Sequence, residues 1–278
     1  MLDQIRIGTV ALVAAFCLPV AIAQAQDMSK YPTNWEGLWG RGPGMRPNNW
    51  DPNKPAGLRQ QAPLTPEYQK VLENNVANQK SGKFFDPKSE CYPPGMPRMM
   101  SIYQPMEIII KPNITYFLLE STSPIRRVFT DGRKWPETFP PAYAGYSIGE
   151  WLDSDGDGKY DTLAIETRGI SGKRLVDSSI PLADDDSTVV KEKLSLDKSN
   201  PDVMNNEITI IDSAFSKPWT VTRKYARRKK IEYAEYNCEE RRNVVINGQT
   251  YWIGVDGYLM PIGKDQPPPD LKYFNVKK

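Results

Sequence analysis

The sequence predicts an all-β protein: a mostly antiparallel β-barrel or curved two-layer sandwich with one short N-terminal helix. After residue 105, short runs rich in β-branched and aromatic residues recur, and Gly, Pro, Asn or Asp residues separate them. Only one stretch, near residue 70, carries apolar residues at helical spacing. Because closing or stacking a sheet protects the edges of its strands, we place the barrel first and the sandwich second.

The first 25 residues have the pattern of a signal peptide. Arg6 precedes an apolar stretch from Ile7 to Ala23, and small residues up to Ala25 suit cleavage. The apolar stretch is short for a spanning helix, so a retained membrane anchor is the weaker alternative. We therefore predict that residues 1–25 are removed and that residues 26–278 form one β-rich domain without a stable membrane anchor, in the periplasm or secreted.

Residues 26–63 are rich in Pro, Asn, Gly and Trp and have no helix or strand period, which predicts an extended segment that wraps the core. We interpret its tryptophans as side chains that cover hydrophobic surface of the core. The alternative is an exposed platform on which sugars stack. Thr65 can cap a helix, and Pro66 suits the first helical position. Apolar residues then follow at helical spacing, so the one helix is expected over residues 66–79.

Each predicted strand is an apolar or alternating run that turn residues end. The predicted strands cover residues 107–111, 114–119, 126–130, 147–152, 162–167, 189–196, 207–211, 220–225, 231–236, 244–246 and 249–253. The clearest turn is Asn247-Gly248, because both residue types tolerate the positive φ of a tight hairpin. The proline-rich start of residues 266–278 predicts an extended C-terminal strap.

The chain contains no histidine, which excludes Ser-His-Asp and Cys-His catalysis and imidazole-bound zinc, copper or iron. The string from Gly145 to Gly149 matches the G-x-S-x-G pattern of serine hydrolases, but Ser147 lacks a histidine base and a strand pattern follows it. A serine-lysine arrangement is a minor alternative. The formal net charge of +2 shows no bias toward nucleic acid. No haem, zinc or nucleotide site is indicated.

Two cysteines, Cys91 and Cys238, remain after signal removal, in a compartment that permits oxidation. We predict a disulfide between them, and two buried free thiols are the alternative. The bridge would close a long loop, which the chain-entropy model values at about 4 to 5 kcal/mol.

Residues 153–161 match the first nine positions of a calcium loop, since acidic residues alternate before a glycine. The predicted ligands are the carboxylates of Asp153, Asp155, Asp157 and Asp161 and the carbonyl of Lys159. The twelfth position is Ala164 instead of a bidentate glutamate, and the flanks are predicted strands, so the loop is not an EF-hand. We expect a structural calcium ion of modest affinity that clamps a β-hairpin. A metal-free acidic turn is the alternative.

A candidate pocket is formed by charged residues within or beside the predicted strands. They are Arg126, Arg127, Asp131, Arg133, Glu166, Glu192, Asp212 and Glu235, and Glu207 and Arg223 share the pattern. In a polar cavity, arginines would bind an anionic group and a carboxylate would act as base. Structural ion pairs or solvent-facing positions are the alternative. The basic run at residues 223–230 is interpreted as a solvated hairpin end, with membrane phosphates or an anionic partner as the alternative.

Several strings resemble a family of exported bacterial proteins to which no reaction is assigned. They are Gly145-Tyr-Ser-Ile-Gly149 with Trp151, Asp131-Gly-Arg133, Asp161-Thr-Leu163 with Glu166-Thr167, Pro218-Trp219 and Cys238-Glu239. The resemblance spans most of the chain after the signal peptide and brings no catalytic residue with it. This chain differs from the family by the acidic loop, where members have a shorter turn.

The leading functional hypothesis is an exported β-barrel that binds a small, partly hydrophobic ligand in its interior and carries a structural calcium loop. A histidine-free isomerase, lyase or hydrolase that uses carboxylate and arginine residues of the cavity is the first alternative. An envelope interaction module without a cavity is the second. A filled barrel would disfavour both hypotheses that place the site inside it.

Overall fold

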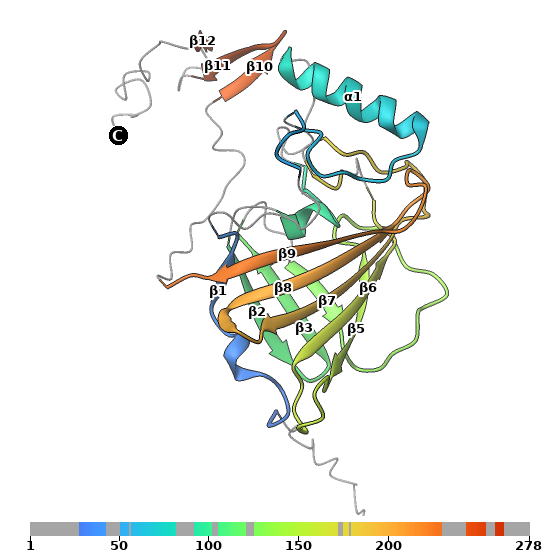
Figure 1. Ribbon diagram of the computed structural model, residues 1–278, viewed down its shortest axis with the longest axis vertical. Helices are drawn as coiled ribbons and strands as arrows, with labels where there is room; N and C mark the ends of the chain where they lie inside the picture. Colours follow the sequence, from blue (N-terminus) through green and yellow to red (C-terminus); the bar gives the residue numbers. More distant parts are fainter. Residues whose placement is uncertain are drawn as a thin grey trace, which may run out of the picture.

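The computed structural model describes residues 28–42, 51–55, 57–81, 92–101, 105–120, 125–171, 175–177, 179–229, 243–253 and 259–263 (Figure 1). Several predicted features lie outside these residues: the signal peptide, the strand at 231–236 with Glu235, both cysteines of the disulfide, and the strap at 266–278.

Nine strands close into a barrel (Figure 1). They are β1 (Leu38–Gly40), β2 (Met106–Lys111), β3 (Ile114–Leu119), β4 (Ile125–Phe129), β5 (Tyr146–Leu152), β6 (Thr162–Arg168), β7 (Val189–Asp197), β8 (Asn200–Ile211) and β9 (Trp219–Arg227). Neighbouring strands are antiparallel except β4 and β5, which run parallel. β1 closes the barrel by pairing with both β2 and β9. The prediction of a mostly antiparallel β-barrel with one short helix is confirmed.

A second, three-stranded antiparallel sheet contains β10 (Asn243–Ile246), β11 (Gln249–Ile253) and β12 (Leu259–Pro261). The turn between β10 and β11 is Asn247-Gly248, as expected, with φ angles of 50° and 81°. Both residue types adopt positive φ readily, which is what a two-residue hairpin turn requires.

The helix α1 spans Pro66–Lys80 and lies beyond the upper end of the barrel in Figure 1. Its first turn is capped as predicted, because the Thr65 side chain accepts a hydrogen bond from the backbone N–H of Tyr68. Leu72 and Val76 are buried on its inner side. Two short 3₁₀ segments, η1 (Thr33–Trp35) and η3 (Arg98–Ser101), complete the described helical residues. Within the described part of the chain, no helix is both long and apolar enough to cross a membrane.

Side chains fill the described interior of the barrel. The strands alternate between buried and outward residues, as in β6, where Leu163, Ile165 and Thr167 are buried between more exposed neighbours. Trp35 and Trp39, from the segment predicted to wrap the core, are 1 % and 0 % exposed. These two rings therefore plug the core and offer no surface on which a sugar could stack.

The parallel contact between β4 and β5 is short, with only two residue pairs. An aromatic cluster covers its outer side: the ring centroids of Phe129 and Tyr146 lie 5.1 Å apart, and those of Tyr146 and Phe139 lie 5.0 Å apart. The guanidinium group of Arg133 stacks over the Phe129 ring at 3.8 Å. The segment between β4 and β5 thus covers the barrel at its short parallel contact.

Candidate functional site

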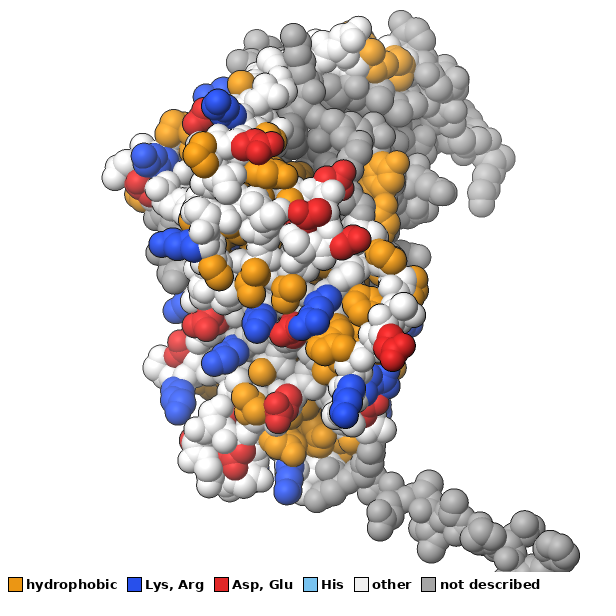
Figure 2. All heavy atoms as spheres, turned by 90° about the vertical axis from the view of Figure 1, so that its right-hand side faces the viewer, with side chains coloured by type: hydrophobic (Ala, Val, Ile, Leu, Met, Phe, Trp, Pro, Cys, Tyr) orange, Lys and Arg blue, Asp and Glu red, His pale blue; other side chains and the backbone are white. Residues whose placement is uncertain are grey.

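A groove of about 860 Å³ lies on the outer face of β5, β6, β7 and β8. Strand register brings two rows of outward residues together across these strands. One row is Glu150, Ala164, Lys193 and Glu207, and the next row is Ile148, Glu166, Lys191 and Thr209. Figure 2 views the molecule from the right-hand side of Figure 1 and shows acidic and basic side chains mixed over the barrel.

The floor of the groove is Ala164, at the centre of the first row. Its register partners are Glu150 on β5 and Lys193 on β7, and both have exposed side chains. A methyl group between two long side chains leaves the surface of the sheet open at that point. The small side chain of Ala164 thus contributes to the hollow, together with Gly132 and Gly149 in the lining.

Tyr31 and Tyr160 form an aromatic wall of the groove, and they adjoin Trp151, whose side chain is buried on the inward face of β5. The Tyr31 ring packs edge-on against both others, at centroid distances of 5.9 Å to Trp151 and 5.1 Å to Tyr160. Its hydroxyl donates to the carbonyl of Pro112 at 3.2 Å. The backbone N–H of Tyr160 donates to the Lys30 carbonyl at 2.8 Å, which ties the N-terminal segment to the end of the acidic loop. Burial, and then the nearby Tyr160, raises the pKa of Tyr31.

The charged groups of the groove fall into paired and unpaired sets. Glu166 forms ion pairs with Arg168 at 2.5 Å and with Lys191 at 3.4 Å. By contrast, Glu150, Lys193 and Glu207 make no ion pair and no side-chain hydrogen bond with any described residue. The first row of the groove therefore presents two carboxylates and one ammonium group to solvent without internal partners.

Inside the barrel, Arg126 from β4 and Glu192 from β7 form a buried ion pair, and both side chains are 0 % exposed. The pair is bidentate, with Nη1 bonded to Oε1 at 3.2 Å and Nη2 bonded to Oε2. Arg126 Nη2 also donates to Thr167 Oγ1 at 3.0 Å, and Asn206 Nδ2 donates to Glu192 Oε1 at 2.9 Å. Burial raises the pKa of the neighbouring Tyr225 to about 12, and its hydroxyl donates to the Met100 carbonyl at 2.7 Å.

Three of the predicted pocket residues, Arg133, Glu166 and Glu192, border the groove, and the other described ones do not. Consecutive positions of a strand face opposite sides, so Arg126 points into the barrel and Arg127 points out to solvent. Arg133 and Glu166 border the outer groove, where Arg133 is held by an ion pair with Asp131 at 2.6 Å. That pair, with Arg133 as the dominant partner, lowers the pKa of Asp131.

Two further predicted residues also have structural partners. The carboxylate of Asp212 accepts hydrogen bonds from the backbone N–H groups of Ala183 and Ala214, at 3.0 Å and 2.8 Å, and thereby fixes a turn. Arg223, which shares the pattern, is buried and donates to Gln60 Oε1 at 3.1 Å, and its burial lowers its pKa. Neither residue borders the groove. The groove residues that sequence reasoning missed include Glu150, Lys191, Lys193 and Ala164.

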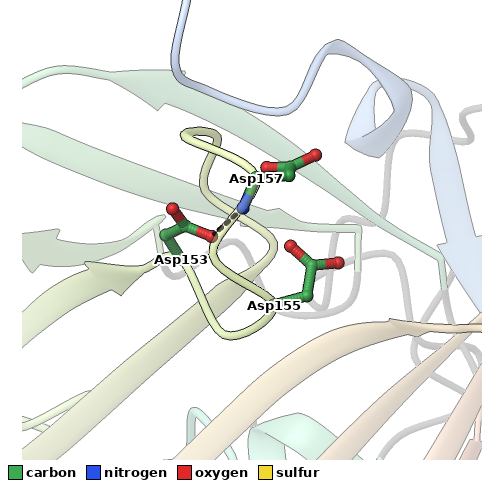
Figure 3. Close-up of side chains that lie close together, drawn as sticks. All are labelled: Asp153, Asp155 and Asp157. Carbon is green, nitrogen blue, oxygen red and sulfur yellow. Dashed lines mark hydrogen bonds between the residues drawn. The ribbon is translucent and has the colours of Figure 1, made fainter.

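The acidic loop forms the exposed tip of the β5–β6 hairpin (Figure 3). Asp153, Asp155 and Asp157 each place one carboxylate oxygen within 4.8 Å of the others. Asp153 organises the loop: its Oδ1 accepts from the N–H groups of Gly156 and Asp157, at 2.7 Å and 3.1 Å, and its Oδ2 accepts from Gly158 at 2.9 Å. Convergent carboxylate oxygens of this kind can bind a hard cation such as calcium.

Asp161 stands apart from this group of three carboxylates. Its Oδ1 accepts a hydrogen bond from the backbone N–H of Ser154 at 3.1 Å, which closes the base of the loop. Burial raises the pKa of Asp161, but hydrogen bonds from Thr162 and Ser154 outweigh that effect, and the net pKa is below its usual value. The structure therefore brings together three of the four predicted carboxylate ligands, and Asp161 closes the base of the loop.

A comparison with protein-family models finds no match to this chain, and a comparison with curated proteins finds no similar sequence.

Proposed function

We propose that this protein is an exported β-barrel that binds a small, partly hydrophobic ligand in the groove on its outer face. The observation that carries the proposal is the contrast between the groove and the interior. The groove, at about 860 Å³, has the size of a small-molecule site. The inward side chains of the barrel, such as Phe117 and Leu194 at 0 % exposure, leave the described interior filled.

The lining of the groove suits a ligand with an apolar part and a polar part. Tyr31 and the outward Ile148 offer apolar contact. Aromatic residues of this kind supply large, rigid contact areas for a ligand. Glu150 and Lys193 offer charged groups beside the Ala164 floor. Orientation of a ligand by a few polar groups around an apolar surface is the usual design of a small-molecule site.

The buried ion pair removes Glu192 as a candidate general base. A general base must reach the proton that it removes. Glu192 is enclosed in the core, where Arg126 and Asn206 bind its oxygens. Its carboxylate therefore stabilises the barrel and is not presented to a substrate in the described network.

In this proposal, the acidic loop binds a structural calcium ion with modest affinity. The three clustered carboxylates of Asp153, Asp155 and Asp157 would bind the ion. Tyr160, next to this loop, forms part of the aromatic wall, and its backbone N–H donates a hydrogen bond to the Lys30 carbonyl. Calcium would thus clamp the β5–β6 hairpin and steady one wall of the groove, without taking part in a reaction.

The binding proposal is tested by measuring how a dye binds to the native protein and to a variant whose groove is blocked by a larger side chain. The probe is 1-anilinonaphthalene-8-sulfonate, a small and partly hydrophobic dye whose fluorescence rises in an apolar site. We expect saturable binding to the native protein, weakened by about tenfold, or 1.4 kcal/mol, in Ala164→Leu because the larger side chain occupies the floor. The matched control is Ala226→Leu, since Ala226 is also a half-buried outward alanine and lies on β9 away from the groove.

Equal dye affinity in the native protein and Ala164→Leu would contradict the proposal. So would the absence of saturable binding to the native protein. Thermal unfolding of both variants provides the check that each one is folded.

A further inference from the structure

A second cavity, of about 710 Å³, lies beside the groove, next to the acidic loop. Its lining comes from the N-terminal segment at residues 29–35, from the acidic loop and from the β7–β8 hairpin. Tyr31 and Tyr160 border both this cavity and the groove. The two hollows therefore adjoin, and one ligand can extend from the groove into the second cavity.

Strand register continues the outer face of the groove into this second cavity. The row next to that of Ala164 contains Thr162, Ser195 and Asn205, and all three line the second cavity. Because Thr162 and Ala164 are two residues apart on β6, this row lies about 7 Å from the groove floor. Its three side chains are half-buried and uncharged, and their oxygen atoms can form hydrogen bonds with a ligand.

Two members of this row have hydrogen-bonding capacity that the described residues leave unused. The Oδ1 atom of Asn205 is buried and has no partner among the described residues, although Nδ2 donates to Asp197 Oδ2 at 3.3 Å. The hydroxyl group of Ser195 makes no hydrogen bond with any described residue. A buried polar atom without a partner is unfavourable, so a ligand that donates a hydrogen bond to Asn205 Oδ1 would stabilise this site.

The charged residues of the second cavity favour a neutral ligand. The charged residues in its lining are Asp155, Asp157, Lys159, Asp161, Asp197 and Lys198. Asp155 and Asp157 are proposed calcium ligands, so a bound ion would offset most of the charge of the acidic loop. The other four are two acidic and two basic residues. Asp161 and Asp197 already accept hydrogen bonds from backbone N–H groups, at 3.1 Å and 2.9 Å.

We propose that the ligand of the groove is a neutral glycoside, which rests on the proposed binding function. Its hexose ring occupies the second cavity, and its apolar aglycone passes Tyr31 and Tyr160 into the groove. A hexose carries several hydroxyl groups, each of which can donate and accept a hydrogen bond. One hydroxyl group donates to Asn205 Oδ1 while a neighbouring one bonds to Ser195 Oγ. A cavity of about 710 Å³ has room for such a ring.

The groove provides the apolar contacts of the aglycone. Ile148 and Ala164 both face outward in its lining. The charged residues beside them, Glu150, Lys193 and Glu207, are exposed, so their charged ends remain in water while an apolar group contacts their stems. Lys193 and Glu207 are also register partners with opposite charges. The aglycone therefore needs no charge of its own.

Isothermal titration calorimetry with octyl β-D-glucoside, below its micelle-forming concentration and in a buffer that contains calcium, tests the proposal. Methyl β-D-glucoside carries only the sugar, and octanol carries only the apolar chain. We expect each fragment to bind the native protein at least about tenfold more weakly than octyl glucoside, because each one occupies only one of the two hollows.

Two variants assign each part of the glycoside to its hollow. Ser195→Leu fills the second cavity and should weaken the binding of octyl glucoside by about tenfold, with octanol binding unchanged. Ala164→Leu fills the groove and should weaken octanol binding by about tenfold, with methyl glucoside binding unchanged. Ala226→Leu on β9 is the matched control, because this half-buried outward position borders neither hollow. It should keep the native affinity for all three compounds.

A smaller change at the same position separates a lost hydrogen bond from the effect of added bulk. Ser195→Ala removes only the hydroxyl group, so we expect octyl glucoside to bind about three- to tenfold more weakly. Octanol should bind Ser195→Ala as it binds the native protein. Thermal unfolding of each variant provides the check that it is folded.

The glycoside assignment is overturned if octyl glucoside binds the native protein no more tightly than octanol does, or if Ser195→Leu binds octyl glucoside as the native protein does. Either result, with dye binding that still depends on Ala164, leaves the proposed groove function intact. Methyl glucoside binding that Ser195→Leu abolishes, with dye binding that Ala164→Leu does not affect, overturns the groove function but not the sugar site. Failure of both the glucosides and the dye to bind overturns the two together.

Discussion

Replacement of Arg126 by methionine is expected to lower the free energy of unfolding by about 3 to 5 kcal/mol, because it leaves a buried carboxylate without its partner. Both Arg126 and Glu192 are 0 % exposed, so water cannot take over the lost contact. Thr167 loses a hydrogen-bond donor in the same variant. Urea denaturation followed by circular dichroism measures the loss.

Two comparisons separate charge burial from a general effect of mutation. The double variant Arg126→Met with Glu192→Met should recover most of the loss, because two apolar side chains leave no unpaired charge in the core. Lys191→Met removes an exposed partner of Glu166 and should change stability by less than about 1 kcal/mol. A loss below about 1 kcal/mol in Arg126→Met itself would mean that the pair is not the buried structural element described here.

Calcium is expected to bind the acidic loop with a dissociation constant of roughly 0.1 to 1 mM, the range of extracellular sites that need not be tight. At 10 mM calcium this affinity would stabilise the folded protein by about 1.4 to 2.7 kcal/mol. Asp153→Asn should abolish that stabilisation, because it removes one charge from the three clustered carboxylates. Calorimetric titration and thermal unfolding with and without calcium provide the two measurements.

The matched control is Asp186→Asn, which removes an exposed carboxylate far along the chain from the loop and should keep the response to calcium. Magnesium should stabilise the protein less than calcium, because it prefers a smaller octahedral site and retains its waters. No detectable heat at millimolar calcium, or equal binding by Asp153→Asn, would rule out the calcium site.

Most of the fold could be predicted because its determinants are local. Alternation and turn residues located β2 to β7 to within about one residue of their observed ends, and a capping hydroxyl with proline located α1. The start of β8 was missed because Asn200, Pro201 and Asp202 have the composition of a turn, although they continue the strand. β1, with three residues, is too short to show a period, and only its pairing with β2 and β9 makes it a strand.

The candidate site was less predictable because it depends on which face each residue occupies and on strand register. The sequence showed charges within strands but could not bring them together, so it grouped Arg126 with Arg127 although they face opposite sides. Ala164 was considered only as a missing calcium ligand, whereas register places it on the groove floor between Glu150 and Lys193. The acidic loop was recognised because its carboxylates are close in sequence and converge within one turn.

Methyl NMR with 1-anilinonaphthalene-8-sulfonate is the most direct test of the central claim, that the ligand binds on the outer face of a filled barrel. The methyl groups of Ile148 and Ala164 point into the groove, whereas those of Leu194 and Ile208 are buried inside the barrel. We predict concentration-dependent shifts of the Ile148 and Ala164 signals, with the Leu194 and Ile208 signals unchanged. Shifts confined to Leu194 and Ile208 would place the ligand inside the barrel and contradict the claim.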